Sequence, residues 1–285
     1  MSQATIGVIG GSGLYAMAGL EDIEQVALET PYGAPSAAYT LGTIAGQRVA
    51  FLPRHGVGHR LLPSEVPYRA NVYGMRLLGI RYLIAVSAVG SLREDYAPGH
   101  VVVPDQLYDR TRGRRADTFF GDGVVAHIGF DEPYDAQLRA RLYAAAADAG
   151  ADVHRGGTLV VMEGPAFSTR AESEENRRQG HSLIGMTALP EAKLAREAQI
   201  AYATLAMVTD YDCWHPEHAS VSVAAVIAVL AANVALSQEI IRRVVPLINI
   251  GFASPAHTAL QYAVMTETAR VAPERMAQIA PLLAA

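Results

Sequence analysis

The sequence predicts an α/β fold, with a mostly parallel central β-sheet flanked by helices, in one domain that spans residues 1–285. Three observations predict this fold. Short β-branched runs alternate with helix-like stretches, which is typical of a parallel sheet. Several runs are apolar on both faces, as strands are when helices cover both sides of a sheet. No internal repeat and no long Gly/Ser or Pro linker divides the chain, so we expect a single domain.

Each element follows from a local pattern. The expected strands, in chain order, are residues 4–9, 48–53, 81–87, 100–103, 157–162 and 202–209. The expected helices carry Ala, Leu, Arg and Glu at helical spacing and cover residues 64–78, 135–149, 188–198 and 218–244. Gly79 and Gly150 follow two of these helices as stop signals. Residues 105–135 and 252–262 lack periodicity, and we expect long loops there that are functional or make subunit contacts.

Composition excludes several classes of protein. The 23 Lys+Arg and 28 Asp+Glu residues give a net charge of −5, and the basic cluster at residues 110–115 is short, which indicates a solvated loop. A single cysteine, Cys213, excludes an intrachain disulfide. The longest apolar run, Val223 to Ala232, is shorter than the roughly twenty residues that cross a bilayer, and the N-terminus lacks signal-peptide features. We therefore expect a cytoplasmic protein that binds neither membranes nor nucleic acid.

Polar groups follow three of the expected strands. Residues 10–13 (GGSG) offer backbone amides for an anion-binding nest, to which Ser12 adds a hydroxyl. Residues 53–56 (PRHG) and 87–91 (SAVGS) follow two further strands. Ligands of open α/β sheets bind beyond the carboxyl ends of the strands, where an arginine can direct two donors to an oxyanion and a protonated histidine can add another. The three segments together predict a pocket for free phosphate, although each alone is also compatible with an ordinary surface or loop residue.

The same glycines fit a dinucleotide-binding fingerprint. Gly11-x-Gly13-x-x-Ala16 has the required spacing, and Glu29 lies 29 − 11 = 18 residues after Gly11. The alternative function is thus a nicotinamide-dependent oxidoreductase. The interval from Leu14 to Glu24 contains Gly19 and barely accommodates a crossover helix, which argues against this alternative.

Two carboxylates follow the last expected strand. Asp210 and Asp212 would point to the same side of an extended segment. Placed close together in a partly apolar pocket, they would repel each other, so the pKa of one would rise and it could act as a general acid beside a fixed acceptor. The alternative is an acidic turn that caps the following helix. We expect no metal here, because two carboxylates without a His or Cys at ligand spacing do not make a cation site.

An aromatic residue follows another expected strand. Residues 163–170 (EGPAFSTR) place Phe167 next to hydroxyl side chains at a turn. Its ring could stack on a planar ligand, although a single Phe is more often a core residue.

Six ordered blocks resemble one known family. GGSGLY, PRHG, SAVGSLRE, MEGPAFSTRAES, GMTALPEAKLARE and TDYDCW are similar to the methylthioadenosine phosphorylase branch of the trimeric purine nucleoside phosphorylases. The resemblance runs from about Ile6 to about Arg243 and is poor over the remaining C-terminal residues. It implies a pentosyltransferase of purine and methionine salvage. Inorganic phosphate would attack the anomeric carbon of S-methyl-5′-thioadenosine and release adenine and 5-methylthioribose 1-phosphate, with no metal or organic cofactor.

The resemblance also implies site residues. Phosphate would contact Ser12, Arg54, His55, Ser87, the backbone at Ala88, and Thr187. Purine and ribose would contact Val89, Gly90, Phe167, Ser168, Met186, Asp210 and Asp212. Asp210, Asp212 and His55 would be catalytic, with Asp210 giving or sharing a proton at purine N7 and Asp212 accepting from the 6-amino group. His127 would reach the 5′ pocket of a neighbouring subunit in a homotrimer.

Three positions bear on the choice of nucleoside. Relatives that use 6-oxopurines typically carry Asn at the position of Asp210 and a Glu-Thr pair in place of Ser168-Thr169, and relatives that prefer a 5′-hydroxyl tend to carry His at the position of Val223. The resemblance therefore implies adenine and an apolar 5′ group. A phosphorylase for inosine, guanosine or methylthioinosine is the alternative within the family. A nucleosidase and a catalytically silent nucleoside-binding subunit are the alternatives outside this reaction, and the predicted phosphate pocket argues against the first of them.

Overall fold

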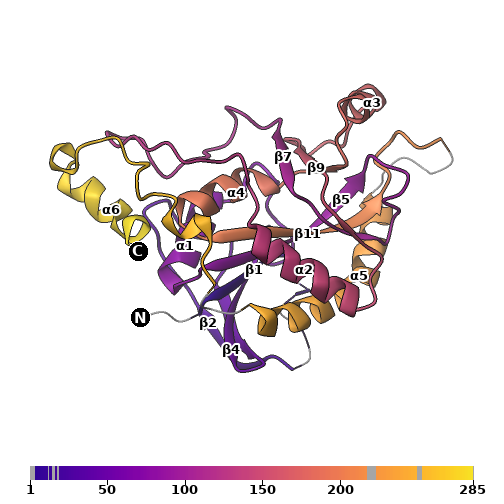
Figure 1. Ribbon diagram of the computed structural model, residues 1–285, viewed down its shortest axis with the longest axis horizontal. Helices are drawn as coiled ribbons and strands as arrows, with labels where there is room; N and C mark the ends of the chain where they lie inside the picture. Colours follow the sequence, from indigo (N-terminus) through magenta and orange to yellow (C-terminus); the bar gives the residue numbers. More distant parts are fainter. Residues whose placement is uncertain are drawn as a thin grey trace.

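A computed structural model of the chain describes residues 4–11, 13–14, 17, 19–216, 223–248 and 252–284, with the backbone alone for 223–232. The described strands are β1 Ile6–Gly10, β2 Glu21–Val26, β3 Tyr39–Ile44, β4 Gln47–Pro53, β5 Tyr82–Ser91, β6 Val101–Val103, β7 Gln106–Asp109, β8 Val153–Arg155, β9 Thr158–Val161, β10 Leu183–Gly185 and β11 Ala201–Asp210. They form one sheet in the order β2-β3-β4-β1-β5-β10-β9-β7, from which β11 branches at β5 and continues through β6 to β8 (Figure 1). Strand β5 is therefore the centre of the sheet.

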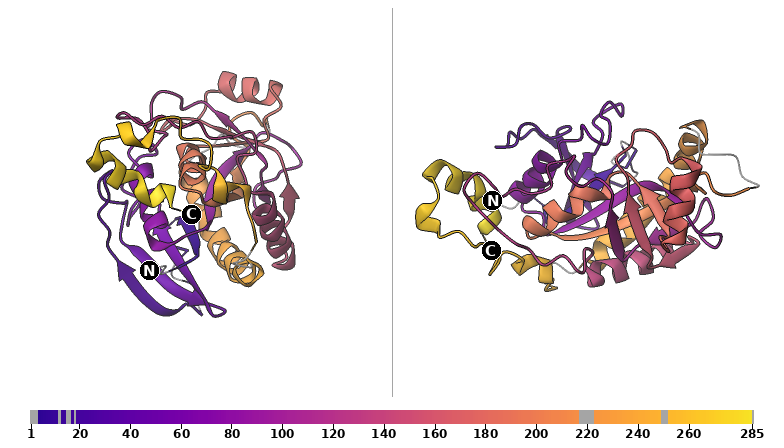
Figure 2. Two further views of the ribbon diagram at one scale, coloured as in Figure 1. Left: turned by 60° about the vertical axis from the view of Figure 1, so that its left-hand side comes forward. Right: turned by 90° about the horizontal axis from the view of Figure 1, so that it is seen from above.

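Helices cover the sheet on both faces. They are α1 Tyr68–Leu78, α2 Ala136–Asp148, α3 Arg170–Arg178, α4 Ala188–Glu197, α5 Val223–Val244 and α6 Pro273–Leu283. The apolar residues of α1, α4 and α6 share one core cluster, and those of α2 and α5 share a second one on the other face (Figures 1 and 2). Strands β5 and β11 are buried between these layers, as their apolar runs predict. The α/β fold expected from the sequence is thus confirmed.

The sheet is more mixed than expected. Six pairings are parallel, including those that join β1 to β4 and β5, whereas four are antiparallel among the described strands. The antiparallel pairs include β2 with β3, a hairpin-like edge that the sequence did not predict. Strand β2 is exposed and rich in Glu and Asp, which gives it the polar composition of an edge strand and no apolar alternation.

The long segment at residues 105–135 is not entirely irregular. It begins with β7, which pairs in parallel with β9. Strand β7 is too short for its sequence to show a recognisable alternation of polar and apolar residues. The segment extends along the outside of α4 toward α6 (Figure 1). Two hydrogen bonds attach it to the C-terminal end of α4, because the Glu197 carboxylate accepts from Thr118 Oγ1 at 2.7 Å and from the Phe119 N–H at 2.7 Å. Glu197 is only 5% exposed.

The buried Glu197 carboxylate makes stability depend on pH. Burial raises its pKa from 4.5 to about 7, against the hydrogen bonds from Phe119 and Thr118 and the charge of Lys193, while Asp117 raises it further. Between these pH values the folded state binds more protons than the unfolded state, so the free energy of unfolding falls as pH rises, by up to about 3 kcal/mol. Glu197→Gln is neutral throughout and keeps an acceptor for the Phe119 N–H.

We expect the melting temperature of the wild type, relative to that of Glu197→Gln, to decrease from pH 5 to pH 8. Melting curves of both proteins in one buffer series measure this difference. A difference that stays constant over this range would show that Glu197 does not titrate there.

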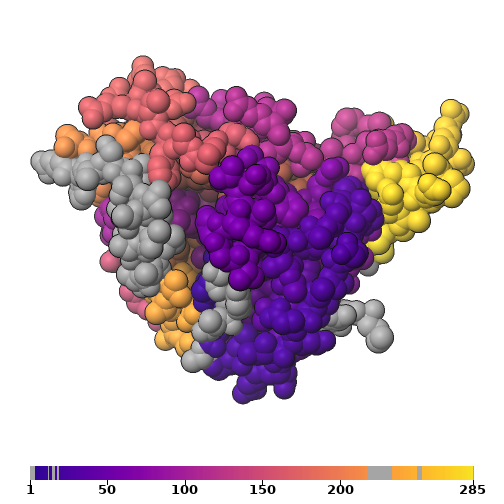
Figure 3. All heavy atoms as spheres, turned by 180° about the vertical axis from the view of Figure 1, so that it is seen from behind, coloured from indigo at the N-terminus to yellow at the C-terminus, as the bar shows by residue number. Residues whose placement is uncertain are grey.

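The C-terminal segment packs against α1. Tyr73 donates its hydroxyl to the Gln278 carbonyl at 2.7 Å, and Arg76 Nε donates to the Pro281 carbonyl at 2.9 Å. The residues of α6 lie at the edge of the molecule, beside the face that residues of the N-terminal third largely form (Figure 3). No helix within the described residues combines the length and apolar character needed to span a membrane.

Candidate active site

The carboxyl ends of four neighbouring strands meet at one edge of the sheet. Gly10 at the end of β1 pairs with Pro53 at the end of β4, and the Arg54 N–H donates to the Gly10 carbonyl at 2.9 Å. Strand β5 runs parallel to both β1 and β11, and its Gly90 pairs with Asp210. The structure therefore brings four parts of the chain to a common edge of the sheet. They are Gly10 of the glycine segment (residues 10–13), the arginine segment (residues 53–56), the serine segment (residues 87–91) and the pair Asp210 and Asp212.

The glycine segment passes closely between its neighbours. A Cβ atom on Gly10 would lie 2.6 Å from Leu14 Cδ1 and 3.0 Å from the Val86 carbonyl oxygen, so a larger residue would push β1 away from β5. Ser12 itself lies outside the described residues. The next described element after β1 is the exposed strand β2, antiparallel to β3, and not the crossover helix that a dinucleotide-binding unit requires. The oxidoreductase alternative is therefore wrong.

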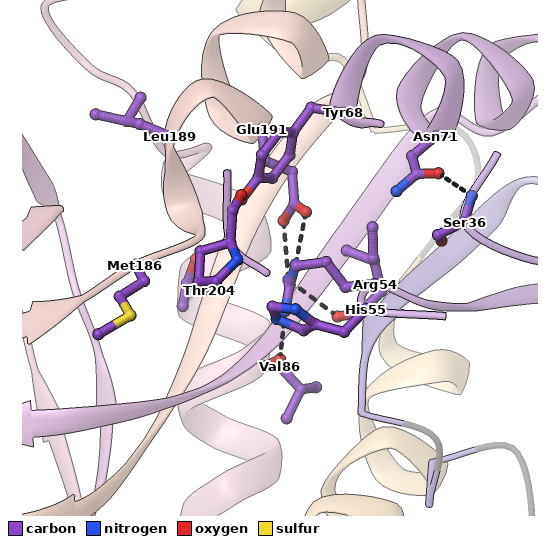
Figure 4. A network of polar contacts seen from close by, with 12 residues as sticks. Ser36, Arg54, His55, Tyr68, Asn71, Val86, Met186, Leu189, Glu191 and Thr204 are labelled. Atoms are coloured by element: carbon purple, nitrogen blue, oxygen red, sulfur yellow. Dashed lines mark hydrogen bonds and ion pairs between the residues drawn. The ribbon is translucent and has the colours of Figure 1, made fainter. Parts of the chain in front are cut away.

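Arg54 is buried and directed toward the protein. Its Nε and Nη2 donate to the two carboxylate oxygens of Glu191 on α4, at 2.7 and 2.9 Å (Figure 4). Its Nη1 donates to the carbonyl of Val86, one residue before Ser87, at 3.2 Å. We expected two donors of Arg54 to bind phosphate. This expectation is corrected for Nε and Nη2, which donate to Glu191.

His55 is neutral at pH 7. Its Nδ1 lies 2.8 Å from the Leu61 carbonyl oxygen, which can only accept, so Nδ1 carries the proton and Nε2 is an acceptor. Burial lowers the pKa of His55 to about 4, and Arg54 and the stacked ring of His59, 4.3 Å away, also lower it. The expectation that a protonated His55 donates to an anion is corrected, because a buried imidazole beside a cation loses its proton.

Two hydroxyls near Arg54 lack the partners that their positions would suggest. Ser87 Oγ is buried and makes no hydrogen bond to the described residues. Thr187 occupies the N-cap position of α4, yet its side chain makes no capping hydrogen bond. Ala88 follows Ser87 on β5 and is partly accessible. An oxyanion bound between β5 and the start of α4 would give both hydroxyls a hydrogen-bond partner.

Asp210 is held by two hydrogen bonds. Its Oδ2 accepts from Thr209 Oγ1 at 2.7 Å, and its Oδ1 accepts from the Asp212 N–H at 2.7 Å. Burial raises the pKa of Asp210 above its ordinary value, and the charge of Asp212 raises it further, although both hydrogen bonds oppose the shift. A Cβ atom on Gly90 would lie 2.9 Å from Asp210 Oδ1, so glycine is needed where β5 passes this carboxylate.

Asp212 is brought to the site by a turn. The register between β11 and β5 shifts after Val208, and Asp212 has a φ of 53° in the left-handed region, so the two aspartates do not share one face of an extended strand as expected. Its Oδ2 is buried with no hydrogen-bond partner among the described residues. Burial raises the pKa of Asp212, while the hydroxyls of Ser173 and Ser168 lower it. Ser173, on α3, was not predicted, because α3 has almost no apolar residue to reveal it.

The segment with Phe167 lies against the aspartate turn. Cys213 donates its thiol to the Ser168 carbonyl at 3.4 Å, and the Ser168 hydroxyl lies 3.8 Å from Met162 Sδ. Phe167 is 40% exposed, so it is not a core residue, which was the alternative interpretation of an isolated Phe. Met186 is half-buried, and Val89 is 3% exposed within the core cluster.

One residue of the basic cluster is buried beside the site. Arg115 donates from Nε to the Glu163 carboxylate at 3.0 Å and from Nη1 to the carbonyls of Met186 and Leu189 at 2.6 and 2.8 Å. Its Nη1 also lies 3.2 Å from the Tyr68 hydroxyl. Arg115 itself is therefore not a solvated side chain, because its four partners come from three separate segments of the chain that it holds together.

Two further predicted residues, His127 and Val223, are not placed in this constellation by the described contacts. His127 is exposed. Its backbone N–H donates to the Ala263 carbonyl at 2.9 Å, so His127 lies beside the C-terminal segment. Val223 is the first residue of α5, and its side chain lies outside the described residues.

A family model described as the phosphorylase superfamily matches residues 5–246. The chain belongs to the phosphorylase superfamily. The match ends close to where the sequence resemblance ends. Within the superfamily, S-methyl-5′-thioadenosine phosphorylase of Chloroflexus aurantiacus is 65% identical over 282 residues, which are 99% of this chain and 98% of that protein. The enzyme of the same name from Geobacter sulfurreducens is 58% identical over 272 residues, 95% of each chain.

Solved structures of the superfamily share the fold. A crystal structure of methylthioadenosine phosphorylase from an antarctic soil metagenomic library has a TM-score of 0.95 and 49% identity, and the match covers 100% of both chains. Methylthioadenosine phosphorylase from Schistosoma mansoni in complex with adenine has a TM-score of 0.82 and 37% identity, and the match covers 86% of this chain and 92% of that one. The family expected from the sequence is confirmed.

Proposed function

We propose that this superfamily member catalyses the phosphorolysis of S-methyl-5′-thioadenosine. An oxygen of inorganic phosphate forms a bond to C1′ of the ribose, the C1′–N9 bond breaks, and its electron pair leaves with adenine, which takes up a proton. The products are adenine and 5-methylthioribose 1-phosphate. The proposal places the enzyme in purine and methionine salvage and assigns it the reaction of its curated relatives.

The observation that carries the proposal is a pair of buried, unpartnered oxygens, one on β5 and one in the turn that follows β11. Ser87 Oγ and Asp212 Oδ2 have no hydrogen-bond partner among the described residues, and β5 and β11 bring them to one edge of the sheet. A buried polar atom without a partner costs stability unless a ligand satisfies it. A hydroxyl suits a phosphate oxygen, and a carboxylate oxygen suits the 6-amino group of adenine.

Asp210 is the proposed general acid. The leaving adenine needs a proton at N7 as the C1′–N9 bond breaks and the sugar gains oxocarbenium character. Burial raises the pKa of Asp210, which favours the protonated form that can donate. Asp212 accepts from the 6-amino group, while Phe167, Ser168, Met186, Val89 and Gly90 surround the nucleoside.

Phosphate is the proposed nucleophile and only co-substrate. The glycine nest with Ser12, the hydroxyls of Ser87 and Thr187, the Ala88 N–H and one free N–H of Arg54 bind its oxygens. The neutral His55 accepts a hydrogen bond at Nε2 from the hydroxyl of a protonated phosphate, because its Nδ1 proton faces Leu61. The anion then lies next to the positive charge that develops on the sugar, so no metal or organic cofactor is required.

We further propose that the enzyme is a cytoplasmic homotrimer in which His127 reaches a neighbouring active site. Residues 124–127 pair with the C-terminal segment, since Met265 N–H donates to the Val125 carbonyl at 2.8 Å. Around this pairing the side chains of Val125, Tyr262 and Met265 are 49%, 87% and 67% exposed. A second copy of the chain is the occupant that would cover this apolar patch, and Val223 would line the methylthio pocket.

The test is the phosphate dependence of adenine release. Purified protein is expected to release adenine from S-methyl-5′-thioadenosine only when phosphate is added, because water has no binding site equivalent to the oxyanion pocket. Chromatography of adenine and sugar phosphate, with and without phosphate, measures both products. Comparable adenine release in phosphate-free buffer would instead establish a nucleosidase. Inosine under the same conditions tests the base, and faster release of hypoxanthine than of adenine would establish the 6-oxopurine alternative.

A further inference from the structure

One buried ion pair of the site includes Glu191, a residue to which the proposed reaction assigns no role. Arg54 and Glu191 face each other with both charged groups out of solvent, their side chains being 3% and 0% exposed. Glu191 comes from α4 and accepts hydrogen bonds from Nε and Nη2 of the guanidinium, as Figure 4 shows. Arg54 Nη1 donates to the carbonyl of Val86, so the pair lies next to Ser87 of the proposed phosphate pocket.

Most donors of Arg54 are already occupied. Nε donates once, to Glu191, Nη1 donates to the Val86 carbonyl, and Nη2 donates to Glu191 and, at 3.4 Å, to the Ile9 carbonyl. Four of the five N–H groups therefore have acceptors among the described residues, and one on Nη1 has none. Arg54 can offer an anion one hydrogen bond and the field of its charge.

The field of that charge is largely cancelled. Glu191 Oε1 also accepts from the Tyr202 hydroxyl at 2.9 Å, so both carboxylate oxygens are hydrogen-bonded. Burial alone would lower the pKa of Arg54, but the Glu191 carboxylate raises it overall, so the guanidinium stays charged. The other titratable groups beside the pair are His55, Tyr68, Tyr134 and Tyr202. Burial lowers the pKa of His55 and raises the pKa of the three tyrosine hydroxyls. An approaching phosphate therefore meets an ion pair with no net charge.

We propose that Glu191 is a positioning residue that fixes Arg54 in place and that its negative charge weakens phosphate binding. This inference rests on the proposed function, since it concerns the affinity of the same pocket. Without Glu191 the low-dielectric surroundings would expose a full positive charge to phosphate and to the sugar phosphate product. Both would then bind too tightly for rapid release. With Glu191 present, affinity comes mainly from neutral donors such as the hydroxyls of Ser87 and Thr187.

Sequence alone did not single out Glu191. It stands in the block GMTALPEAKLARE among residues with a helical period, and helical spacing puts it on the same face as Leu194 and Ala195, which are fully buried. A carboxylate on the buried face of an amphipathic helix requires a partner, which was the available signal. The partner is 191 − 54 = 137 residues away, so only the fold identifies it.

The test measures the dissociation constant of inorganic phosphate by titration calorimetry on the full chain. Glu191→Gln removes the negative charge and keeps the size, so we expect phosphate to bind at least about fivefold more tightly. Steady-state kinetics should show a lower KM for phosphate together with a lower kcat, because product release slows. A variant that merely loosened the site would raise that KM.

Matched variants separate charge from geometry. Glu191→Asp keeps the charge, and Tyr202→Phe removes one hydrogen bond without changing any charge, so both should bind phosphate within about threefold of the wild type. The double variant R54M/E191M replaces the ion pair by apolar side chains, a change that buried pairs often tolerate. It should bind within about tenfold of the wild type, whereas Arg54→Met alone leaves an unpaired carboxylate and should bind at least about a hundredfold more weakly.

The order of these affinities decides the matter. Weaker or unchanged phosphate binding by folded Glu191→Gln would overturn the proposal. Should that variant not fold, equal losses in Arg54→Met and the double variant would overturn it, because Glu191 would then have no effect of its own. Phosphate binding needs no turnover, so a correct order of affinities without adenine release would refute the proposed reaction alone.

Discussion

Replacing Asp210 with Asn is expected to lower kcat/KM for S-methyl-5′-thioadenosine by about 10²–10⁴-fold, the usual effect of losing a general acid. The substitution leaves the local structure intact. An amide oxygen still accepts from the Asp212 N–H, and an amide NH₂ can donate to Thr209 Oγ1, which in turn lies 3.2 Å from the Val89 carbonyl. Only the transferable proton is lost. Initial rates at saturating phosphate measure the effect, and melting temperatures show whether the fold is kept.

The pH profile gives an independent check on this role of Asp210. A general acid is active in its protonated form, so wild-type kcat/KM should fall as pH rises through the raised pKa of Asp210. Asp210→Asn should lack this decrease. Thr209→Val removes a hydrogen bond that lowers this pKa and should move the decrease to higher pH. Asp210 would lose the role if Asp210→Asn kept a rate within about threefold of the wild type.

How far the sequence predicts this fold depends on the burial of each element. Strands β1, β5 and β11 are apolar on both faces because helices cover them, and such runs are recognisable without a structure. Gly79 and Gly150, with φ values of 91° and 79°, adopt the left-handed conformation expected of helix stops. Strands β8 and β10 have three residues each, and α3 is almost entirely polar, so no period marks them.

The site follows the same division. Residues at or just after the ends of the predicted strands, such as Arg54, Ser87 and Asp210, could be grouped from sequence, because parallel strands end at one edge, although β5 continues past Ser87 to Ser91. What each side chain faces could not be predicted. Arg54 faces Glu191, Arg115 faces Glu163, and His55 faces the Leu61 carbonyl, and these contacts decide charge and protonation. They depend on the packing of elements far apart in the chain.

Arg115 and Glu197 show that the segment at residues 105–135 belongs to the site's supporting structure. Arg115 ties it to the carbonyl of Met186, and Glu197 ties Phe119 to the end of α4. The same segment continues to His127 and its pairing with the C-terminal residues. One continuous stretch of chain therefore joins the exposed patch around His127 to Arg115, which contacts Met186 of the proposed nucleoside pocket.

Replacing Asp212 with Asn should change the preferred base. The carboxylate can only accept, so it suits the 6-amino group of adenine, whereas an amide can also donate to the 6-oxygen of hypoxanthine. We expect kcat/KM for S-methyl-5′-thioadenosine to fall and that for inosine to rise, so that their ratio changes by about 10²-fold or more, as unpaired buried groups require. Parallel rate measurements with both nucleosides give this ratio.

Asn is the appropriate replacement because of the backbone at this position. The φ of 53° places Asp212 in the left-handed region, which Asn adopts more readily than most residues. The buried Oδ2 lacks a partner, so an amide there disrupts no hydrogen bond among the described residues. Asp212→Ala retains neither donor nor acceptor and should lower the rates on both bases. Asp212→Asn should change kcat/KM for the two nucleosides in opposite directions only if residue 212 contacts the 6-position of the base. A parallel decrease of both values would place Asp212 away from that position.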